Sequence, residues 1–495
     1  MASLARRAVL RSLPLALAPA AKRFGLALRQ PGYEQRRLRR RFARELARTA
    51  YGRALGVRHG GDWNRVPVVD YDTLAPWLDR QRAEEGAIVT PERVRFYEKT
   101  SGSSGRAKYI PYTAAKQQGL RELFAAWAYD VLRRGPKLRT GRIYLSVSPR
   151  FGARQTTPTG RPVGLEHDGA YLGRALQALL GAFWAGPRPG VEYRDADGFL
   201  TAVAESLAAT RDLEIVSVWN PSLFEVVLDR IADLHGAEPD WVALWPELRL
   251  VSCWDAAAAA PMAERLRRRL PHALLQGKGL LATEAVVTVP WIRAGGCVPF
   301  VHHTLVELLT DDGAVLPLVA AQVGTTYEVV VSTAGGLVRY RLGDRVRVTH
   351  RYGRVPCLVF VGRAGGVSDL VGEKLHEAYV ARILDEHLPR HGFLTLLPVL
   401  GPPAHYALVS DRPVPRAAIE AIEASLSEAH HYGLARSLGQ LARLRGVVHR
   451  SAAHLVTARE ARRGLRLGDV KPRALQLQPA DTTLLEQLGS LRAPR

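Results

Sequence analysis

The sequence is poor in cysteine and contains no long hydrophobic run, and both shortages restrict what the chain can be. The three cysteines (Cys253, Cys297 and Cys357) lie far apart and lack metal-ligand spacing, so we expect reduced thiols in a cytoplasmic protein. No stretch reaches the roughly 18 consecutive apolar residues of a membrane-spanning helix, so no transmembrane segment is expected.

Lysine is also scarce, and arginine supplies most of the positive charge. The formal net charge is +22, and only eight of the 69 basic residues are lysines. The arginine clusters at 36–44 and 265–270 have apolar residues at helical spacing, which favours solvated helix faces over a nucleic-acid-binding patch. Where arginine is the default cation, a lysine indicates a need for its compact ammonium. The eight are Lys22, Lys99, Lys108, Lys116, Lys137, Lys278, Lys374 and Lys471.

Acidic residues are absent before Glu34. The basic segment 1–33 is rich in alanine and leucine, like a transit peptide, and Pro14 and Pro19 interrupt it. We expect a loosely held amphipathic start, able to make weak contact with a membrane surface, and then a helix over about 34–55.

The length of 495 residues predicts more than one domain. Strand-like runs alternate with helical stretches from about 86 to 365, which favours α/β layers that are at least partly parallel. The strand-like runs are 141–148, 213–219, 248–254 and 327–336, and the helical stretches are 114–134, 197–210 and 221–236. The sequence from 337 to 363 indicates a pair of strands. We therefore expect a large α/β domain over 34–365 and a smaller, mobile α+β domain over 366–495.

The stretch "YEKTSGSSGRAKYIPYT", residues 97–113, concentrates hydroxyl groups and glycines ahead of a lysine. It lacks the Walker A spacing of glycines and lysine. Gly102 and Gly105 would let the backbone approach a ligand closely, and the Lys108 ammonium suits a phosphate. On local evidence alone, the stretch would be interpreted as a polar turn between two structural elements.

"TSGSSGRAKYIPYT" closely resembles the nucleotide-binding motif of the GH3 acyl-acid amido synthetases, a branch of the adenylate-forming superfamily. The resemblance runs from about residue 30 to 475. It implies that this loop holds the phosphates of ATP through the following residues: Thr100, Ser101, Ser103, Ser104 and Lys108.

"LLATEAVVTVP" (280–290) and "YEVVVSTAGGLVRYRLGDRVRV" (327–348) resemble the next two family motifs. The resemblance implies that Glu284 helps to hold Mg²⁺, with Thr283 beside the reacting carboxyl, and that Asp344 binds the ribose hydroxyls. Taken alone, Glu284 would be a helix-start or salt-bridge residue and Asp344 a turn residue. Leu280 departs from the family pattern, since many members have an adenine-stacking aromatic residue there.

"FVGRAGGVSDLVGEKLHEAYV" (360–380) and "GDVKPRAL" (468–475) resemble the family's hinge and C-terminal lysine motifs. The resemblance implies that Arg363 lies near the ribose, that Lys374 lies near the phosphates, and that Lys471 enters during adenylation. Gly365 and Gly366 would supply the flexible hinge for a rotation of the small domain.

The resemblance implies a ligase that uses ATP and Mg²⁺ to adenylate a carboxylic acid and then transfers the acyl group to an amine, most plausibly an amino acid. A thiol acceptor such as coenzyme A is the alternative, and a non-enzymatic basic binding protein is a third reading. The pairs "HH" at 302–303 and 430–431 lack a G-x-S-x-G elbow and the metal spacing of a histidine hydrolase. His302 and His303, with Trp184, Trp291 and Tyr327, are candidates for lining an acyl pocket.

Overall fold

The computed structural model describes residues 2–101, 107–146, 155–164, 181–187, 193, 195–389, 392–462 and 473–489. Its chain forms two compact units. The first comprises Met1–Lys99, Lys108–Pro221 and Val227–Gly362. The second comprises Arg363–Arg495, and the short segments Thr100–Ala107 and Ser222–Val226 group with it.

A four-stranded parallel sheet of order β3-β6-β7-β8 lies in the first unit. Every residue of β6 and β7 is buried, as expected for parallel strands that are covered on both faces, and this explains why most of their residues are apolar. The strands are β3 (Arg142–Leu145), β6 (Leu213–Ser217), β7 (Leu250–Cys253) and β8 (Leu274–Gly277). The helices in the same stretch are α7 (Ala196–Ala208), α8 (Pro221–His235), α9 (Trp241–Leu244) and α10 (Ala260–Arg269). The prediction of parallel α/β layers is confirmed.

The remaining sheets of the first unit are mostly antiparallel. The largest has the order β12-β11-β13-β14-β15, and the neighbouring β14 and β15 confirm the strand pair predicted before residue 363. Its strands are β11 (Leu305–Leu309), β12 (Val315–Pro317), β13 (Thr326–Ser332), β14 (Tyr340–Tyr352) and β15 (Val355–Arg363). A second sheet has the order β2-β1-β5-β4, formed by β1 (Val94–Ser101), β2 (Ala107–Thr113), β4 (Gln155–Thr156) and β5 (Pro162–Val163). A short pair joins β9 (Thr288–Trp291) and β10 (Gly296–Pro299).

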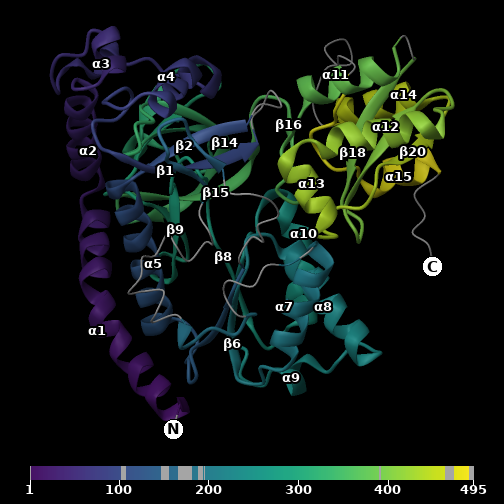
Figure 1. The fold of residues 1–495 in the computed structure, drawn as a ribbon, viewed down its shortest axis with the longest axis horizontal. Coiled ribbons are helices and arrows are strands. Elements are labelled where there is room, and N and C mark those ends of the chain that lie inside the picture. The colour runs from purple at the N-terminus through teal and green to yellow at the C-terminus, as the bar shows by residue number, and fades with distance from the viewer. Residues whose placement is uncertain are drawn as a thin grey trace. The chain divides into compact units, whose positions relative to one another are not determined.

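The N-terminal segment is a long helix, α1 (Ala2–Arg29), that packs along α5 (Ala114–Arg134) in the first unit (Figure 1). Phe24 is fully buried and meets Trp291 edge-on, with ring centroids 5.1 Å apart. Leu10 belongs to a core cluster shared with the parallel sheet. The expectation of a loosely held start is therefore wrong, because one face of this helix lies in the core. Weak contact with a membrane surface stays a prediction.

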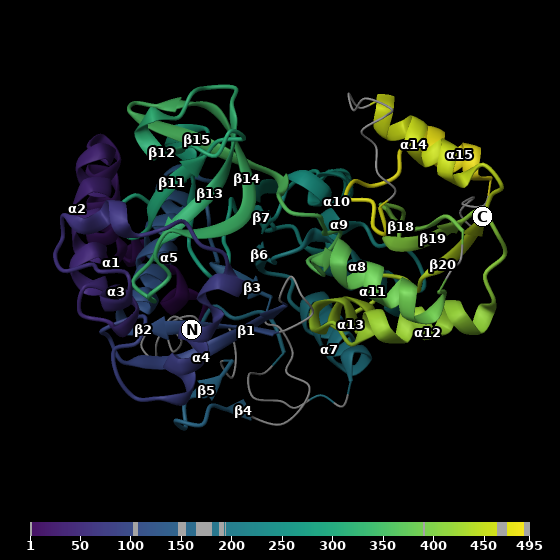
Figure 2. The same cartoon turned by 90° about the horizontal axis from the view of Figure 1, so that it is seen from above.

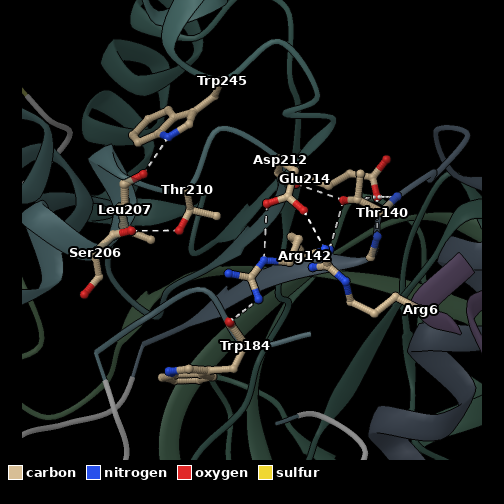
Figure 3. A network of polar contacts seen from close by, with 11 residues as sticks. Arg6, Thr140, Arg142, Trp184, Ser206, Leu207, Thr210, Asp212, Glu214 and Trp245 are labelled. Atoms are coloured by element: carbon tan, nitrogen blue, oxygen red, sulfur yellow. Dashed lines mark hydrogen bonds and ion pairs between the residues drawn. The ribbon is translucent and has the colours of Figure 1, made fainter. Parts of the chain in front are cut away.

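A buried carboxylate organises the polar network to which α1 is tied (Figure 3). The Glu214 side chain accepts the backbone N–H groups of Arg139, Thr140 and Gly141 at 2.6, 2.9 and 2.7 Å. Two residues before it, Asp212 accepts a hydrogen bond from the Arg6 guanidinium at 3.0 Å. A salt bridge thus links the first turns of the chain to the start of β6.

The helix predicted over 34–55 is two helices, α2 (Pro31–Leu46) and α3 (Ala50–Ala54). Thr49 interrupts them, because its hydroxyl caps α3 by accepting the Gly52 N–H at 3.0 Å. A short helix, α4 (Tyr71–Ala83), follows and is capped in the same way by Asp70. No helix among the described residues is long and apolar enough to cross a membrane.

The second unit centres on a three-stranded sheet of order β18-β19-β20, in which β19 and β20 are parallel. Figure 2 shows α14 and α15 on one side of this sheet and α11, α12 and α13 on the other. The strands are β18 (Leu394–Val399), β19 (His405–Ser410) and β20 (Arg445–Val448), with a small pair β16 (Val367–Ser368) and β17 (Leu375–His376). The helices are α11 (Glu377–His387), α12 (Arg416–Ser427), α13 (His430–Ser437), α14 (Ala452–Arg462) and α15 (Thr482–Leu488).

Candidate active site

The stretch 97–113 includes the end of β1 and all of β2, as its strand-like flanks predict. Thr100 and Ser101 end β1, and Lys108 is the second residue of β2. The Lys108 ammonium lies 5.1 Å from the ring centroid of Tyr71. Ser103 and Ser104 lie outside the described residues.

The end of β2 joins the first three sequence motifs within the first unit. The Tyr112 hydroxyl donates to the backbone carbonyl of Thr283 at 2.9 Å. The neighbouring Thr113 hydroxyl donates to the carbonyl of Ala334 at 3.2 Å, in the turn that follows β13. Two adjacent side chains of the IPYT segment (residues 110–113) thus hold together motifs that lie more than 150 residues apart in the sequence.

Lys116, in the first turn of α5, also connects this part of the chain to Thr283, through its charged ammonium group. Its ammonium donates to the Thr283 carbonyl at 3.0 Å and lies 4.1 Å from the ring centroid of Tyr112. Burial lowers the pKa of Lys116 to about 7, although the carboxylates of Glu284 and Glu98 act in the opposite direction. Lys116 is therefore electrostatically coupled to the carboxylate predicted to hold Mg²⁺.

Glu284 itself is buried, with 9% of its surface exposed, in the tight turn Leu281–Val286. Ala282 and Ala285 close this turn through reciprocal backbone hydrogen bonds. The turn contributes one carboxylate, and Mg²⁺ commonly binds through one or two carboxylates completed by phosphate oxygens and water. The donor set therefore fits a magnesium ion shared with a nucleotide.

Asp344 lies inside β14, not in a hairpin turn, and is 1% exposed. The pairing of β13 with β14 shifts register between Glu328 and Val330, opposite Leu342–Asp344. Gly343 takes a φ of +79° there, a conformation that a side chain disfavours. This β-bulge re-aims the following carboxylate, a device found near functional sites.

In the second unit, the charges of Arg363 and Lys374 both lower the pKa of the His431 imidazole. Burial and then the charges of Lys374, His430 and Arg363 lower the pKa of His431 to about 3, so this histidine is neutral near pH 7. Lys374 has a φ of +51°, which is unusual for a residue with a side chain. Its predecessor Glu373 fixes the loop by accepting the N–H groups of Leu370 and Val371, each at 2.7 Å.

Burial raises the pKa of Glu373 to about 7. Its carboxylate accepts a hydrogen bond from Tyr406, whose hydroxyl oxygen also lies 2.9 Å from that of Ser368. These contacts explain how a strained backbone at Lys374 is held in place. Lys471, the predicted C-terminal lysine, lies outside the described residues.

Sequence reasoning missed Lys116. Two features of the sequence could have indicated this residue. It is one of only eight lysines, and it lies in the first turn of the helix that follows the IPYT segment, where a cation is unfavourable to the helix dipole. The suggested pocket residues Trp291 and Tyr327 instead lie in the main hydrophobic core.

Known structures match the fold of this chain over nearly its whole length. The structure of AtGH3.15 acyl acid amido synthetase in complex with 2,4-DB superposes with a TM-score of 0.61, at 17% identity, covering 96% of each chain. A 2-hydroxyisobutyryl-CoA ligase superposes with a TM-score of 0.60, at 15% identity, covering 95% of this chain and 93% of that one. The fold is therefore that of the adenylate-forming enzymes.

Sequence comparison identifies the family within the adenylate-forming enzymes. Residues 20–226 match the GH3 family N-terminal domain and residues 298–363 match the GH3 family central domain, together more than half of the chain. The chain belongs to the GH3 family.

Curated relatives match mostly over short stretches. The indole-3-acetic acid-amido synthetase GH3.15 of Arabidopsis thaliana is 41% identical over 68 residues, which span 14% of this chain and 11% of that protein. The indole-3-acetic acid-amido synthetase GH3.10 of the same plant is 21% identical over 399 residues, covering 65% of this chain and 67% of that protein. The first relatives are thus matched over only about a ninth of their own length.

Proposed function

We propose that this protein is an ATP-dependent acyl-acid amido synthetase. The observation that carries the proposal is the convergence of three family motifs on Tyr112, Thr113 and Lys116 beside Glu284. In the first half-reaction, a carboxylate oxygen of the substrate attacks the α-phosphorus of ATP, a new O–P bond forms, and pyrophosphate leaves. In the second, an amine nitrogen attacks the acyl carbon, AMP leaves, and the amine loses a proton.

The chain's own residues would mainly position and neutralise charge. Thr100, Ser101, Ser103, Ser104 and Lys108 would hold the phosphates, and Asp344 the ribose. In the second unit, Arg363 would contact the ribose, Lys374 the phosphates, and Lys471 would stabilise charge during adenylation.

A magnesium ion, when bound, would neutralise the phosphate oxygens, with Glu284 as its protein ligand and Thr283 beside the reacting carboxyl. An acid, an amine and ATP with Mg²⁺ are therefore the proposed small-molecule partners. Rotation about Gly365 and Gly366, both at positive φ, would separate the two half-reactions.

The test measures pyrophosphate release across a panel of aromatic, fatty and plant-hormone-like acids. We expect release with some acids and at least a hundred-fold less with Lys471→Ala and Glu284→Ala. Absence of acid-dependent release in the unmodified protein would overturn adenylation.

The acceptor is tested separately, by mass spectrometry of products formed with amino acids or with coenzyme A. Amide products support the amido synthetase. Thioester products alone would favour the alternative, an acyl-CoA ligase, for which the similarity to a CoA ligase shows only the shared fold.

A further inference from the structure

Two adjacent imidazoles and a carboxylate meet in the first unit. The Nε2 atoms of His302 and His303 lie 3.3 and 3.2 Å from the same oxygen, Oε2 of Glu122. The three ligand atoms lie within 4.8 Å of one another. We propose that Glu122, His302 and His303 form a Zn²⁺ site.

The spacing suits a tetrahedral ion. Zinc bonds to imidazole nitrogen and carboxylate oxygen of about 2.0–2.2 Å separate ligand atoms by about 3.3–3.6 Å. The two nitrogen–oxygen distances already match this range within about 0.1 Å. The donor set of two imidazoles and one carboxylate suits zinc, whereas magnesium prefers oxygen donors only.

The ligands are held rigidly before any ion arrives. The His303 ring stacks on Phe300, with centroids 5.0 Å apart, and the His302 ring packs against Phe24 at 5.5 Å. Gln35 of α2 fixes the backbone of the turn, since its amide donates to the carbonyls of Val301 and Thr304 at 2.8 and 2.9 Å. Rigid ligands lose little conformational entropy on binding.

The carboxylate also has the outer partners expected of a metal ligand. Its other oxygen, Oε1, accepts a hydrogen bond from Gln118 at 3.0 Å and forms an ion pair with the Arg23 guanidinium at 3.1 Å. Nδ1 of His302 is buried and has no hydrogen-bond partner among the described residues. With the imidazole proton on Nδ1, the Nε2 atom has a lone pair for the ion.

The position favours a structural role over a catalytic one. A zinc ion there would clamp α5 to the turn Val301–Thr304. The Thr304 hydroxyl donates to the Val286 carbonyl at 2.6 Å, and the Phe300 N–H to the Val287 carbonyl at 2.9 Å. The clamp would thus support the strand that follows Glu284, independently of whether the proposed synthetase activity exists.

The test is zinc binding by the full-length, chelator-stripped protein in competition with a chromogenic chelator. We expect one tightly bound equivalent, and affinity reduced at least ten-fold in each of Glu122→Gln, His302→Gln and His303→Gln. Excess Mg²⁺ should not displace the ion. Replacement by Co²⁺ should give the visible absorption bands of a tetrahedral site, and His303→Gln should lose them.

Two control variants separate this site from adventitious binding. His430→Gln alters the other adjacent histidine pair, and Cys297→Ser removes a partly exposed thiol. Both should keep the zinc affinity of the unmodified protein. The proposal fails if the unmodified protein binds no zinc, or if the ligand variants, with unchanged circular dichroism, bind it as tightly. Should His302→Gln not fold, the other two ligand variants decide the matter.

Discussion

The Lys116 ammonium donates a hydrogen bond to the backbone carbonyl of Thr283, with an Nζ–O distance of 3.0 Å. This contact joins the helix after the IPYT segment to the residue before Glu284. Because this lysine fixes the carbonyl that precedes Glu284 and its pKa responds to the charge of that carboxylate, we expect it to act as a positioning residue.

Replacing this lysine should therefore impair adenylation without unfolding the protein. For Lys116→Met we expect a fall of about 10–100-fold in kcat for pyrophosphate release, because Thr283 and Glu284 lose a shared partner. The matched control is Lys137→Met, an exposed lysine just beyond the end of the same helix, which should leave kcat unchanged. Equal kcat values for the two variants would contradict the positioning role.

The lowered pKa of Lys116, about 7, also predicts a pH effect on stability. Between about pH 7 and pH 10, the unfolded state binds a proton at this lysine that the folded state lacks. The unfolding free energy should then rise with pH, by at most about 1.4 kcal/mol per pH unit, relative to Lys116→Met. Urea unfolding of both proteins over this range measures the difference, and parallel pH curves would show that the ammonium is not desolvated.

The bulge at Gly343 should matter for nucleotide binding. Gly343→Ala introduces strain at a φ of +79° without a steric contact, at a cost of about 1–2 kcal/mol, and should displace Asp344. Gly353→Ala is the matched control, because Gly353 has a φ of +60°, equally open surroundings and a place in the β14–β15 turn. Both variants should lose similar stability, but only Gly343→Ala should raise the KM for ATP.

The N-terminal helix should contribute to global stability. Phe24→Ala removes a fully buried ring and should destabilise the protein by about 3–5 kcal/mol. Leu15→Ala on the same helix, where the side chain is 80% exposed, should change stability by less than about 0.5 kcal/mol. Urea denaturation measures the unfolding free energy of both variants. A small effect of Phe24→Ala would support a loosely held N-terminal segment.

The buried Glu214 should be more costly to remove than its exposed neighbours. Glu214→Ala would leave three backbone N–H groups without their acceptor, which predicts a loss of about 3–5 kcal/mol. Glu247→Ala removes a carboxylate that pairs with Arg139 and Arg249 near the surface, and should cost less than about 1 kcal/mol. Chemical unfolding of the two variants tests the ranking.

Much of the fold follows from periodicity. The helix predicted over 114–134 is α5 with the same bounds, and β6 and β7 were recognisable because strands buried on both faces are mostly apolar. The N-terminal helix was misjudged for two reasons. Pro14 and Pro19 normally interrupt a helix, and the partners that bury its face lie far along the chain.

The site was predictable only in part. Motif order identified the family, and the roles assigned to Glu284, Asp344 and Lys374 stay predictions. Lys116 escaped notice because its partner is a backbone carbonyl, which leaves no trace in side-chain chemistry. The Glu122–His302–His303 cluster was equally hidden, since the carboxylate lies about 180 residues before the histidines.

The tie between Arg6 and Asp212 spans 206 residues of sequence. At a synthesis rate of 5–20 residues per second, about 10–40 s separate the emergence of the first helix from that of its partner. During that interval the apolar face of the helix, including Phe24, has no core to enter. This helix is therefore made well before it can reach its final place, and its apolar face needs protection from aggregation in the nascent chain.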